Sequence, residues 1–171
     1  MRIIYCMCGS FCTFERSLKA LERLVLAGHE IIPVMSENAY STDTRFGTAA
    51  MFRERIISLT GKDIIHTIAA AEPIGPIMKP DILIISPCTG NTLAKLANGI
   101  TDTSVTMAAK SVLRSDIPVK IALATNDALG ANLSNIAILR NRKGISFVPM
   151  KMDDPINKPY SLVAEFEKLS V

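Results

Sequence analysis

The sequence predicts a three-layer α/β fold in which a parallel sheet carries helices on both faces. Short, almost wholly apolar segments alternate with segments whose apolar residues recur at helical spacing. Strands with so few polar residues are typical of parallel strands buried on both faces. The 171 residues contain no linker, internal repeat or low-complexity tract, so we expect residues 1–171 to form a single Rossmann-like or flavodoxin-like domain.

The first half of the chain is predicted to contain two main strands and two helices. Arg2–Met7 is the first strand, and a helix with Leu18, Leu21 and Leu24 on one face follows it and ends at Gly28. The other expected elements are a strand at His29–Met35, an irregular stretch at Tyr40–Gly47, a helix from about Thr48 to Leu59, and a short strand or turn at Ile64–Ile68.

The second half repeats the pattern. Glu72–Pro76 contains two prolines and is not expected inside a helix. The apolar run Ile82–Ser86 predicts the third strand, which leads through small polar residues into a long helix that begins near Leu93. The remaining predicted elements are strands at Val119–Ala124 and Ile145–Pro149 and helices at Ile136–Arg142 and Tyr160–Leu169.

Charge and composition exclude several classes of protein. The net charge of +3 is too small, and the Lys/Arg runs are too short, to indicate a nucleic-acid partner. No stretch approaches the roughly 18–20 consecutive apolar residues of a membrane span. The apolar run after Arg2 is short and ends without a signal-peptide cleavage site, so we expect a cytoplasmic protein with no membrane partner. The four cysteines and two histidines lack metal-ligand spacing, so we expect free thiols and no metal.

Small polar segments follow each of the four main strands. Parallel sheets bind ligands beyond the carboxyl ends of their strands, so these segments are expected to converge. They are Gly9–Thr13, Ser36, Ser86–Thr92 and Thr125–Asp127. Gly9-Ser10 before a helix suits a phosphate, or simply a tight turn. The glycine fingerprints of nucleoside triphosphate and dinucleotide sites are absent, so neither ligand is indicated.

The combination of these segments resembles the homo-oligomeric flavin-containing cysteine decarboxylases and their flavoprotein relatives. That family carries a Gly-Ser first loop, a Ser after the second strand, and a Pro-Ala-(Ser/Thr)-Ala-Asn-Thr loop that enters a Leu-Ala-Lys-x-Ala-x-Gly-x-x-Asp helix. Gly9-Ser10, Ser36, Pro87–Thr92 and Leu93–Asp102 match these features. The resemblance implies FMN as the ligand, with Ser10 and Ser36 at its phosphate.

The same resemblance implies a larger set of cofactor-binding residues. Thr89 through Thr92 would line the ribityl chain and the ring. Phe11 and Phe14 would either flank the flavin or pack in the core. The full set of implied cofactor-binding residues is Gly9, Ser10, Phe11, Ser36, Pro87, Thr89, Gly90, Asn91 and Thr92.

The sequence departs from the decarboxylases at the residues that act on their substrate. Their Pro-x-Met-Asn-x-x-Met motif is replaced by Thr125–Gly130, in which Asn126 is the plausible counterpart. His66 lies roughly where the family's catalytic histidine falls but lacks its usual flanks, and a surface or strand-end histidine is the alternative. An FMN-dependent decarboxylase of a cysteinyl substrate therefore remains an alternative function rather than the main one.

Further strings resemble one branch of this superfamily, from spore-forming bacteria. They include Thr42–Gly47, Ala71–Pro76, Thr125–Gly130 and Asp154–Ser161. The branch implies an oxidoreductase subunit of the mother cell, active with a partner protein that carries NAD or NADP. Together the two proteins would convert a hydroxylated tetrahydrodipicolinate to pyridine-2,6-dicarboxylate during sporulation. A homo-oligomer, trimeric or larger, is also implied.

Such a substrate requires cations for its carboxylates and groups that accept protons. The candidate cations are Arg45, Lys110 and Arg114, and the candidate acids are Asp43, Glu72 and Asp127. Each acid also has a structural interpretation, as a helix cap, an exposed turn residue and an Asx turn respectively. The predicted catalytic residues are Arg45, Glu72, Asn126 and Asp127. The sequence is also compatible with a non-catalytic flavin-binding or scaffolding protein and with a flavin prenyltransferase.

Overall fold

The computed structural model describes residues 1–171 and contains one seven-stranded sheet. In the sheet, the strands follow the order β2-β1-β3-β4-β7-β6, and β5 pairs with the first residues of β4. The strands are β1 (Arg2–Met7), β2 (Glu30–Met35), β3 (Ile82–Cys88), β4 (Val119–Thr125), β5 (Ile145–Phe147), β6 (Met150–Asp154) and β7 (Lys158–Ala164). β1 to β5 are parallel, whereas β7 is antiparallel to both β4 and β6.

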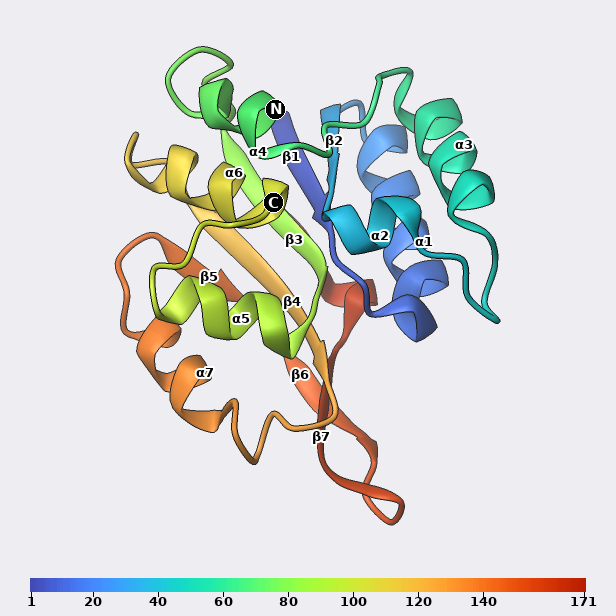
Figure 1. Cartoon of the computed structure of the whole chain (residues 1–171), viewed down its shortest axis with the longest axis vertical. Helices are drawn as coiled ribbons and strands as arrows, with labels where there is room; N and C mark the ends of the chain where they lie inside the picture. Colours follow the sequence, from blue (N-terminus) through green and yellow to red (C-terminus); the bar gives the residue numbers. More distant parts are fainter.

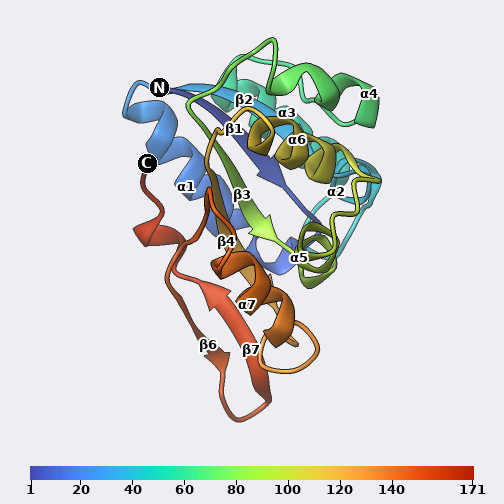
Figure 2. The same ribbon diagram turned by 90° about the vertical axis from the view of Figure 1, so that its left-hand side faces the viewer.

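Helices cover both faces of the sheet (Figure 1). The helices are α1 (Phe14–Leu26), α2 (Glu37–Ser41), α3 (Ala49–Thr60), α4 (Ile68–Ala71), α5 (Gly90–Ala97), α6 (Ser104–Leu113) and α7 (Leu133–Arg140). α1 lies on one side of the sheet, and α5, α6 and α7 lie on the other (Figure 2). The predicted three-layer α/β class is therefore confirmed.

The core consists of one apolar cluster on each face of the sheet. In β1, Ile3, Tyr5 and Met7 belong to the cluster under α1, whereas Ile4 and Cys6 belong to the cluster under α5 and α6. This alternation follows from the two-residue period of a strand, and it requires both kinds of position to be apolar. The unbroken apolar run in the sequence is thus the signature of a strand buried on both faces.

Two predicted helices differ from the observed ones. The long helix predicted after β3 is wrong in extent, because Gly99 adopts a left-handed φ of 71° and ends α5, and a capping box of Thr103 and Thr106 starts α6. The helix predicted at Tyr160–Leu169 is wrong in type. Residues 158–164 form β7, whose Val163 pairs with Ala124 of β4, and only a 3₁₀ turn follows at Phe166–Lys168.

β6 and β7 form a hairpin that projects beyond the body of the protein (Figure 1). Its turn carries Ile156, which is 90% exposed, and Tyr160 of β7 is also exposed. The hairpin joins the sheet only through the last residues of β4, so its tip lies beyond the carboxyl edge of the parallel strands. No helix of the chain is long and apolar enough to cross a membrane.

Candidate functional site

The loops that follow β1, β2 and β3 surround one cavity at the carboxyl edge of the sheet. The chain crosses from one face to the other between β1 and β3, so the strand order reverses there and leaves a crevice. The cavity has a volume of about 380 Å³, and all but one of its eleven lining residues are polar, charged or glycine. Its lining residues are Gly9, Phe11, Ser36, Glu37, Asn38, Thr89, Asn91, Thr92, Lys95, Asp102 and Thr103.

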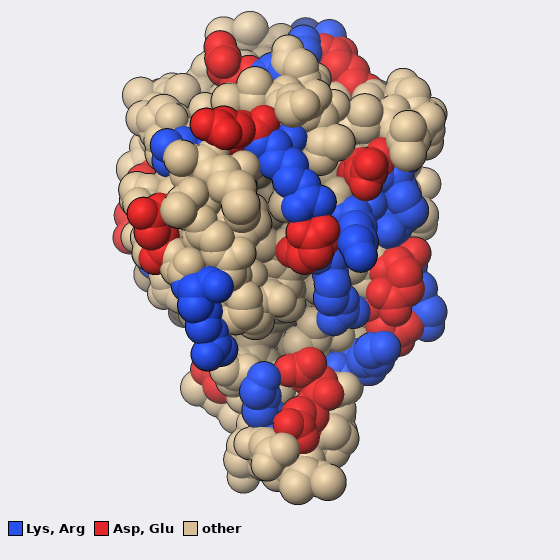
Figure 3. All heavy atoms as spheres, turned by 90° about the vertical axis from the view of Figure 1, so that its right-hand side faces the viewer, with Lys and Arg blue, Asp and Glu red and all other residues tan.

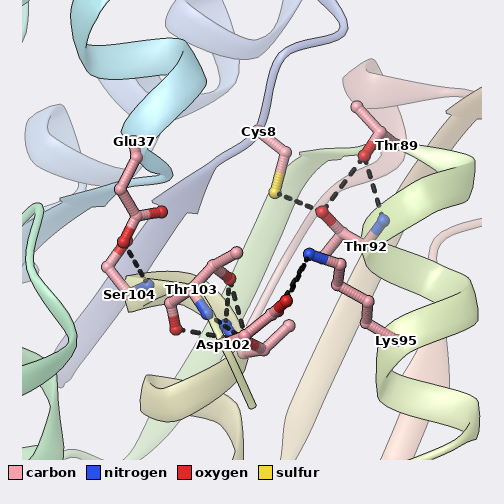
Figure 4. Close-up of polar contacts among 9 residues, drawn as sticks. Cys8, Glu37, Thr89, Thr92, Lys95, Asp102, Thr103 and Ser104 are labelled. Carbon is pink, nitrogen blue, oxygen red and sulfur yellow. Dashed lines mark hydrogen bonds and ion pairs between the residues drawn. The ribbon is translucent and has the colours of Figure 1, made fainter. Parts of the chain in front are cut away.

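The loop between β3 and α5 forms one wall (Figure 4). Thr89 is the N-cap of α5, and its Oγ1 accepts a hydrogen bond from the Thr92 backbone N–H at 3.2 Å. The Thr89 hydroxyl donates to Thr92 Oγ1 at 3.1 Å, and the Thr92 hydroxyl donates to Cys8 Sγ at 3.3 Å. This chain of contacts fixes both threonine rotamers. The Asn91 N–H, in the first turn of α5, has no intrahelical partner, and Asn91 lines the cavity.

α2 and α6 form the opposite wall. Ser36 caps α2 by accepting a hydrogen bond from the Ala39 N–H, so its side chain is held at the cavity rim. Glu37 Oε1 accepts from the Ser104 N–H at 3.0 Å, which ties the start of α2 to the start of α6 (Figure 4). The Ser104 hydroxyl donates to the Met35 carbonyl at 2.6 Å and reinforces this joint.

An ion pair forms part of the cavity wall. Lys95 Nζ lies 2.8 Å from Asp102 Oδ1, and the hydrogen bond from Lys95 holds the pKa of Asp102 below its ordinary value. Lys95 is the one cation in the lining, which also contains two carboxylates, those of Glu37 and Asp102. Deeper in the site, burial raises the pKa of Cys8 to about 11, so its thiol is neutral near pH 7 and serves as a hydrogen-bond acceptor.

The structure brings six of the nine predicted cofactor-binding residues to this cavity. They are Gly9, Phe11, Ser36, Thr89, Asn91 and Thr92. Pro87 lies in β3, where its carbonyl accepts from the Cys8 N–H at 3.0 Å, so it shapes the loop from behind. Ser10 lines a second cavity instead, on the other side of the β1–α1 loop.

Neither Gly90 nor Asp127 lines the cavity. Both belong to a contact between the start of α5 and the loop between β4 and α7. A Cβ atom on Gly90 would lie 2.6 Å from both Asn132 Nδ2 and Thr125 Oγ1 and 3.0 Å from Asp127 Oδ1. The Asp127 carboxylate accepts hydrogen bonds from the Thr125 hydroxyl and from Asn132, and these bonds lower the pKa of Asp127. The close approach at Gly90 is therefore to the β4–α7 loop, and Asp127 holds that loop together.

The other predicted catalytic residues lie outside the cavity. Arg45 is exposed in the turn between α2 and α3, with its guanidinium 4.9 Å from the ring centre of Phe46. The Glu72 carbonyl accepts from the Ser111 hydroxyl near the far end of α6, and Glu72 lines a small recess with Lys110 and Arg114. Asn126 lines the second cavity together with Ser10.

His66 and Asp43 also lie apart from the cavity. The His66 ring stacks on Tyr40 with centroids 3.8 Å apart. Asp43 Oδ1 accepts from the Ala49 N–H at 2.8 Å, which matches the helix-cap interpretation of this residue. Sequence reasoning missed Glu37, Asn38 and Thr103, which no pattern in the chain marks. It also missed Lys95 and Asp102, although both fall inside the family string Leu93–Asp102.

This chain belongs to the Flavoprotein family, which it matches over residues 1–168. It is 45% identical over 168 residues to the B subunit of dipicolinate synthase from Bacillus subtilis (strain 168), a match that covers 98% of this chain and 84% of that protein. The crystal structure of the dipicolinate synthase B subunit from Bacillus halodurans C superposes with a TM-score of 0.89 at 40% identity, covering 98% of this chain and 86% of that one. The resemblance inferred from the sequence is confirmed.

A more distant solved structure carries the same fold. The FMN-dependent cysteine decarboxylase SpaF matches with a TM-score of 0.74 at 26% identity, covering 98% of this chain and 91% of that one. The lower identity agrees with the departures of Thr125–Gly130 and His66 from the decarboxylase pattern.

Proposed function

We propose that this chain binds FMN in the cavity between β1 and β3 and acts as the B subunit of a dipicolinate synthase. Its partner would be the A subunit of that enzyme, which carries NAD or NADP. The pair would convert a hydroxylated tetrahydrodipicolinate to dipicolinate, which is pyridine-2,6-dicarboxylate, by loss of one water molecule and transfer of two electrons to NAD or NADP. The observation that carries the proposal is the 45% identity to the Bacillus subtilis protein over nearly the whole chain. A homo-oligomer, trimeric or larger, and the mother-cell cytoplasm as its location are part of the same proposal.

The donor set of the cavity fits FMN. Its wall offers the Asn91 backbone N–H at the start of α5 and the Ser36 hydroxyl as donors for a phosphate, and the Thr89 and Thr92 hydroxyl oxygens as acceptors for a ribityl chain. Its volume of about 380 Å³ lies in the range of small-molecule sites. Phe11 is the one hydrophobic residue among those that line the cavity, and its side chain supplies an apolar surface for a ring. When bound, FMN supplies a two-electron acceptor.

The residues of this chain would bind and orient rather than react. Asn91, which is exposed at the start of α5, offers an amide that can donate to and accept from the polar edge of a ring. The hydrogen bonds among Thr89, Thr92 and Cys8 hold the two hydroxyls in place before the ligand arrives, which lowers the entropic cost of binding.

An absorption titration tests the flavin part of the proposal. The purified chain should retain flavin bands through gel filtration, or acquire them when FMN is added. Asn91→Tyr should abolish binding because it fills the cavity, whereas Asn98→Tyr at the other end of α5 should leave binding unchanged. A protein that never binds FMN would refute this part.

Reconstitution with the A subunit of dipicolinate synthase tests the synthase part. The mixture should form pyridine-2,6-dicarboxylate with reduction of NAD or NADP, and neither protein by itself should do so. Release of carbon dioxide from a cysteinyl peptide by this chain alone would instead favour the decarboxylase alternative, for which SpaF is the structural precedent.

A further inference from the structure

The second cavity lies between the β1–α1 loop, the end of β4 and the projecting hairpin. It has a volume of about 350 Å³. Consecutive residues of one loop face the two cavities, since Gly9 and Phe11 line the first whereas Ser10, Cys12 and Thr13 line the second. The full lining of the second cavity is Ser10, Cys12, Thr13, Arg16, Ala124, Thr125, Asn126, Asp153, Lys158 and Val163.

Two cations from distant parts of the chain meet at this cavity. Arg16 comes from the first turn of α1, and Lys158 comes from the start of β7. Figure 3 shows the face that carries α1 and α3, on which basic and acidic side chains are interspersed down to the hairpin at the bottom. Asp153 is the one acidic residue in the lining, so the cavity itself has an excess of positive charge.

Both cations keep donors free for a ligand. Lys158 Nζ contacts Asp153 at 3.1 Å, which uses one of its three N–H groups. Arg16 donates to the Ala164 carbonyl at 3.3 Å and lies 3.6 Å from Glu167, a loose pair on the surface. Exposed pairs of this kind are weak, so a multidentate anion can compete with them.

Uncharged polar groups also line this cavity. The Ser10 hydroxyl makes no hydrogen bond within the chain, although the Ser10 carbonyl accepts from Thr13. The Ser161 hydroxyl donates a hydrogen bond to Asn126 Oδ1 at 3.5 Å, and this contact orients the Asn126 side-chain amide just after the end of β4. Ala124 and Val163 supply an apolar surface. Cations, an amide and a hydroxyl around such a surface suit a small ring that carries carboxylates.

We propose that the second cavity binds the dicarboxylate of the synthase reaction, with Arg16 and Lys158 each contacting one carboxylate and Asn126 and Ser10 orienting the ring. The identity of the ligand rests on the proposed function, whereas the location rests on the geometry of this cavity. The assignment replaces Arg45, Lys110 and Arg114, which the structure places elsewhere, as the cations that recognise the substrate.

Cys12 provides a site-specific reporter for the test. It lines the second cavity and is exposed, whereas Cys6, Cys8 and Cys88 are buried. Iodoacetamide should therefore alkylate Cys12 alone in the folded full-length chain, as measured by intact mass. Pyridine-2,6-dicarboxylate at about ten times its dissociation constant should slow the alkylation about tenfold, because occupied protein is protected. Uncharged pyridine should give no protection.

Matched variants distinguish this site from a general effect of charge. Lys158→Ala and Arg16→Gln should each raise the dissociation constant of pyridine-2,6-dicarboxylate about tenfold or more, since each removes a charge-assisted contact. Lys151→Ala, an exposed lysine on the same hairpin outside the lining, should leave it within about twofold.

Three outcomes would overturn the inference. They are absence of protection by the dicarboxylate, equal loss of protection in Lys151→Ala and Lys158→Ala, and protection of Cys12 by FMN alone, which would make the cavity part of the flavin site. The test is run with the FMN-saturated and the FMN-free chain. Normal flavin bands without dicarboxylate protection would reject this site while leaving the proposed function intact.

Discussion

Replacement of Gly90 by alanine tests whether the glycine serves the packing of the β4–α7 loop. The new Cβ atom would lie 2.6 Å from Asn132 Nδ2 and from Thr125 Oγ1, well inside van der Waals contact. These atoms cannot move aside freely, because both donate hydrogen bonds to Asp127. The substitution must therefore strain the backbone or break part of this cluster.

The magnitude follows from the separate contributions. Overpacking of this kind costs about 1–3 kcal/mol, and loss of one hydrogen bond to a charged group costs about 1.5–3 kcal/mol. The better helix propensity of alanine returns at most about 1 kcal/mol. We expect Gly90→Ala to lower the free energy of unfolding by about 2–4 kcal/mol.

Urea unfolding followed by circular dichroism measures this loss. Gly130→Ala is the matched control, because a Cβ there would meet only the Asp127 carbonyl, at 3.6 Å, and the backbone φ of Gly130 is not positive. It should change stability by less than about 0.5 kcal/mol. A Gly90→Ala protein as stable as the wild type, with FMN binding alone impaired, would refute the packing argument and restore Gly90 as a ligand-contacting residue.

Three other predictions concern the core and the surface. Gly75→Ala should be more damaging than Gly90→Ala, by about 3 kcal/mol or more in urea unfolding, because its Cβ would lie 2.0 Å from the Ser111 carbonyl oxygen, a backbone atom. The free energy of unfolding should fall as pH rises from about 10 to about 12, because burial raises the pKa of Tyr5 from 10.0 to about 12 and the unfolded chain therefore loses this proton first. Tyr5→Phe should reduce the dependence of the unfolding free energy on pH in this range. An unchanged dependence would contradict the assignment to Tyr5. Glu15→Gln should cost less than about 1 kcal/mol in thermal unfolding, since its pair with Arg55 is exposed, and a larger loss would show that the pair is not a simple surface contact.

A buried network of hydroxyl groups behind the site, like the contact at Gly90, holds a loop near the cavity in place. The Tyr5 hydroxyl contacts Ser17 Oγ and Ser86 Oγ at 2.9 Å each, and the Ser17 hydroxyl donates to the Ser86 carbonyl. These contacts join α1, β1 and β3 directly behind Pro87, so the loop that lines the cavity is anchored to the core. Tyr5 and Ser86, polar side chains within two otherwise apolar strands, thus anchor the loop that lines the cavity.

The sequence by itself determined the parallel part of the sheet, the polar loops and the family. Short apolar runs such as Ile82–Ser86, alternating with segments of helical spacing, indicated buried parallel strands. Thr89, Asn91 and Thr92 could be placed at the crevice because strand ends in a parallel sheet meet at one edge. Local signals also placed α3, whose Thr48 cap and Gly61 end are read within a few residues of the helix.

The tertiary structure decided what depends on pairing between distant residues. Residues 160–169 have apolar spacing compatible with a helix, but residues 158–164 pair with the end of β4 and with β6 and so form a strand. Gly90 packs against Asn132, and Glu37 accepts a hydrogen bond from Ser104. Arg16 and Lys158 line the same cavity. The two members of each pair are at least 42 residues apart in the chain. Side-chain neighbours of this kind arise from packing of the three layers, which one-dimensional periodicity does not contain.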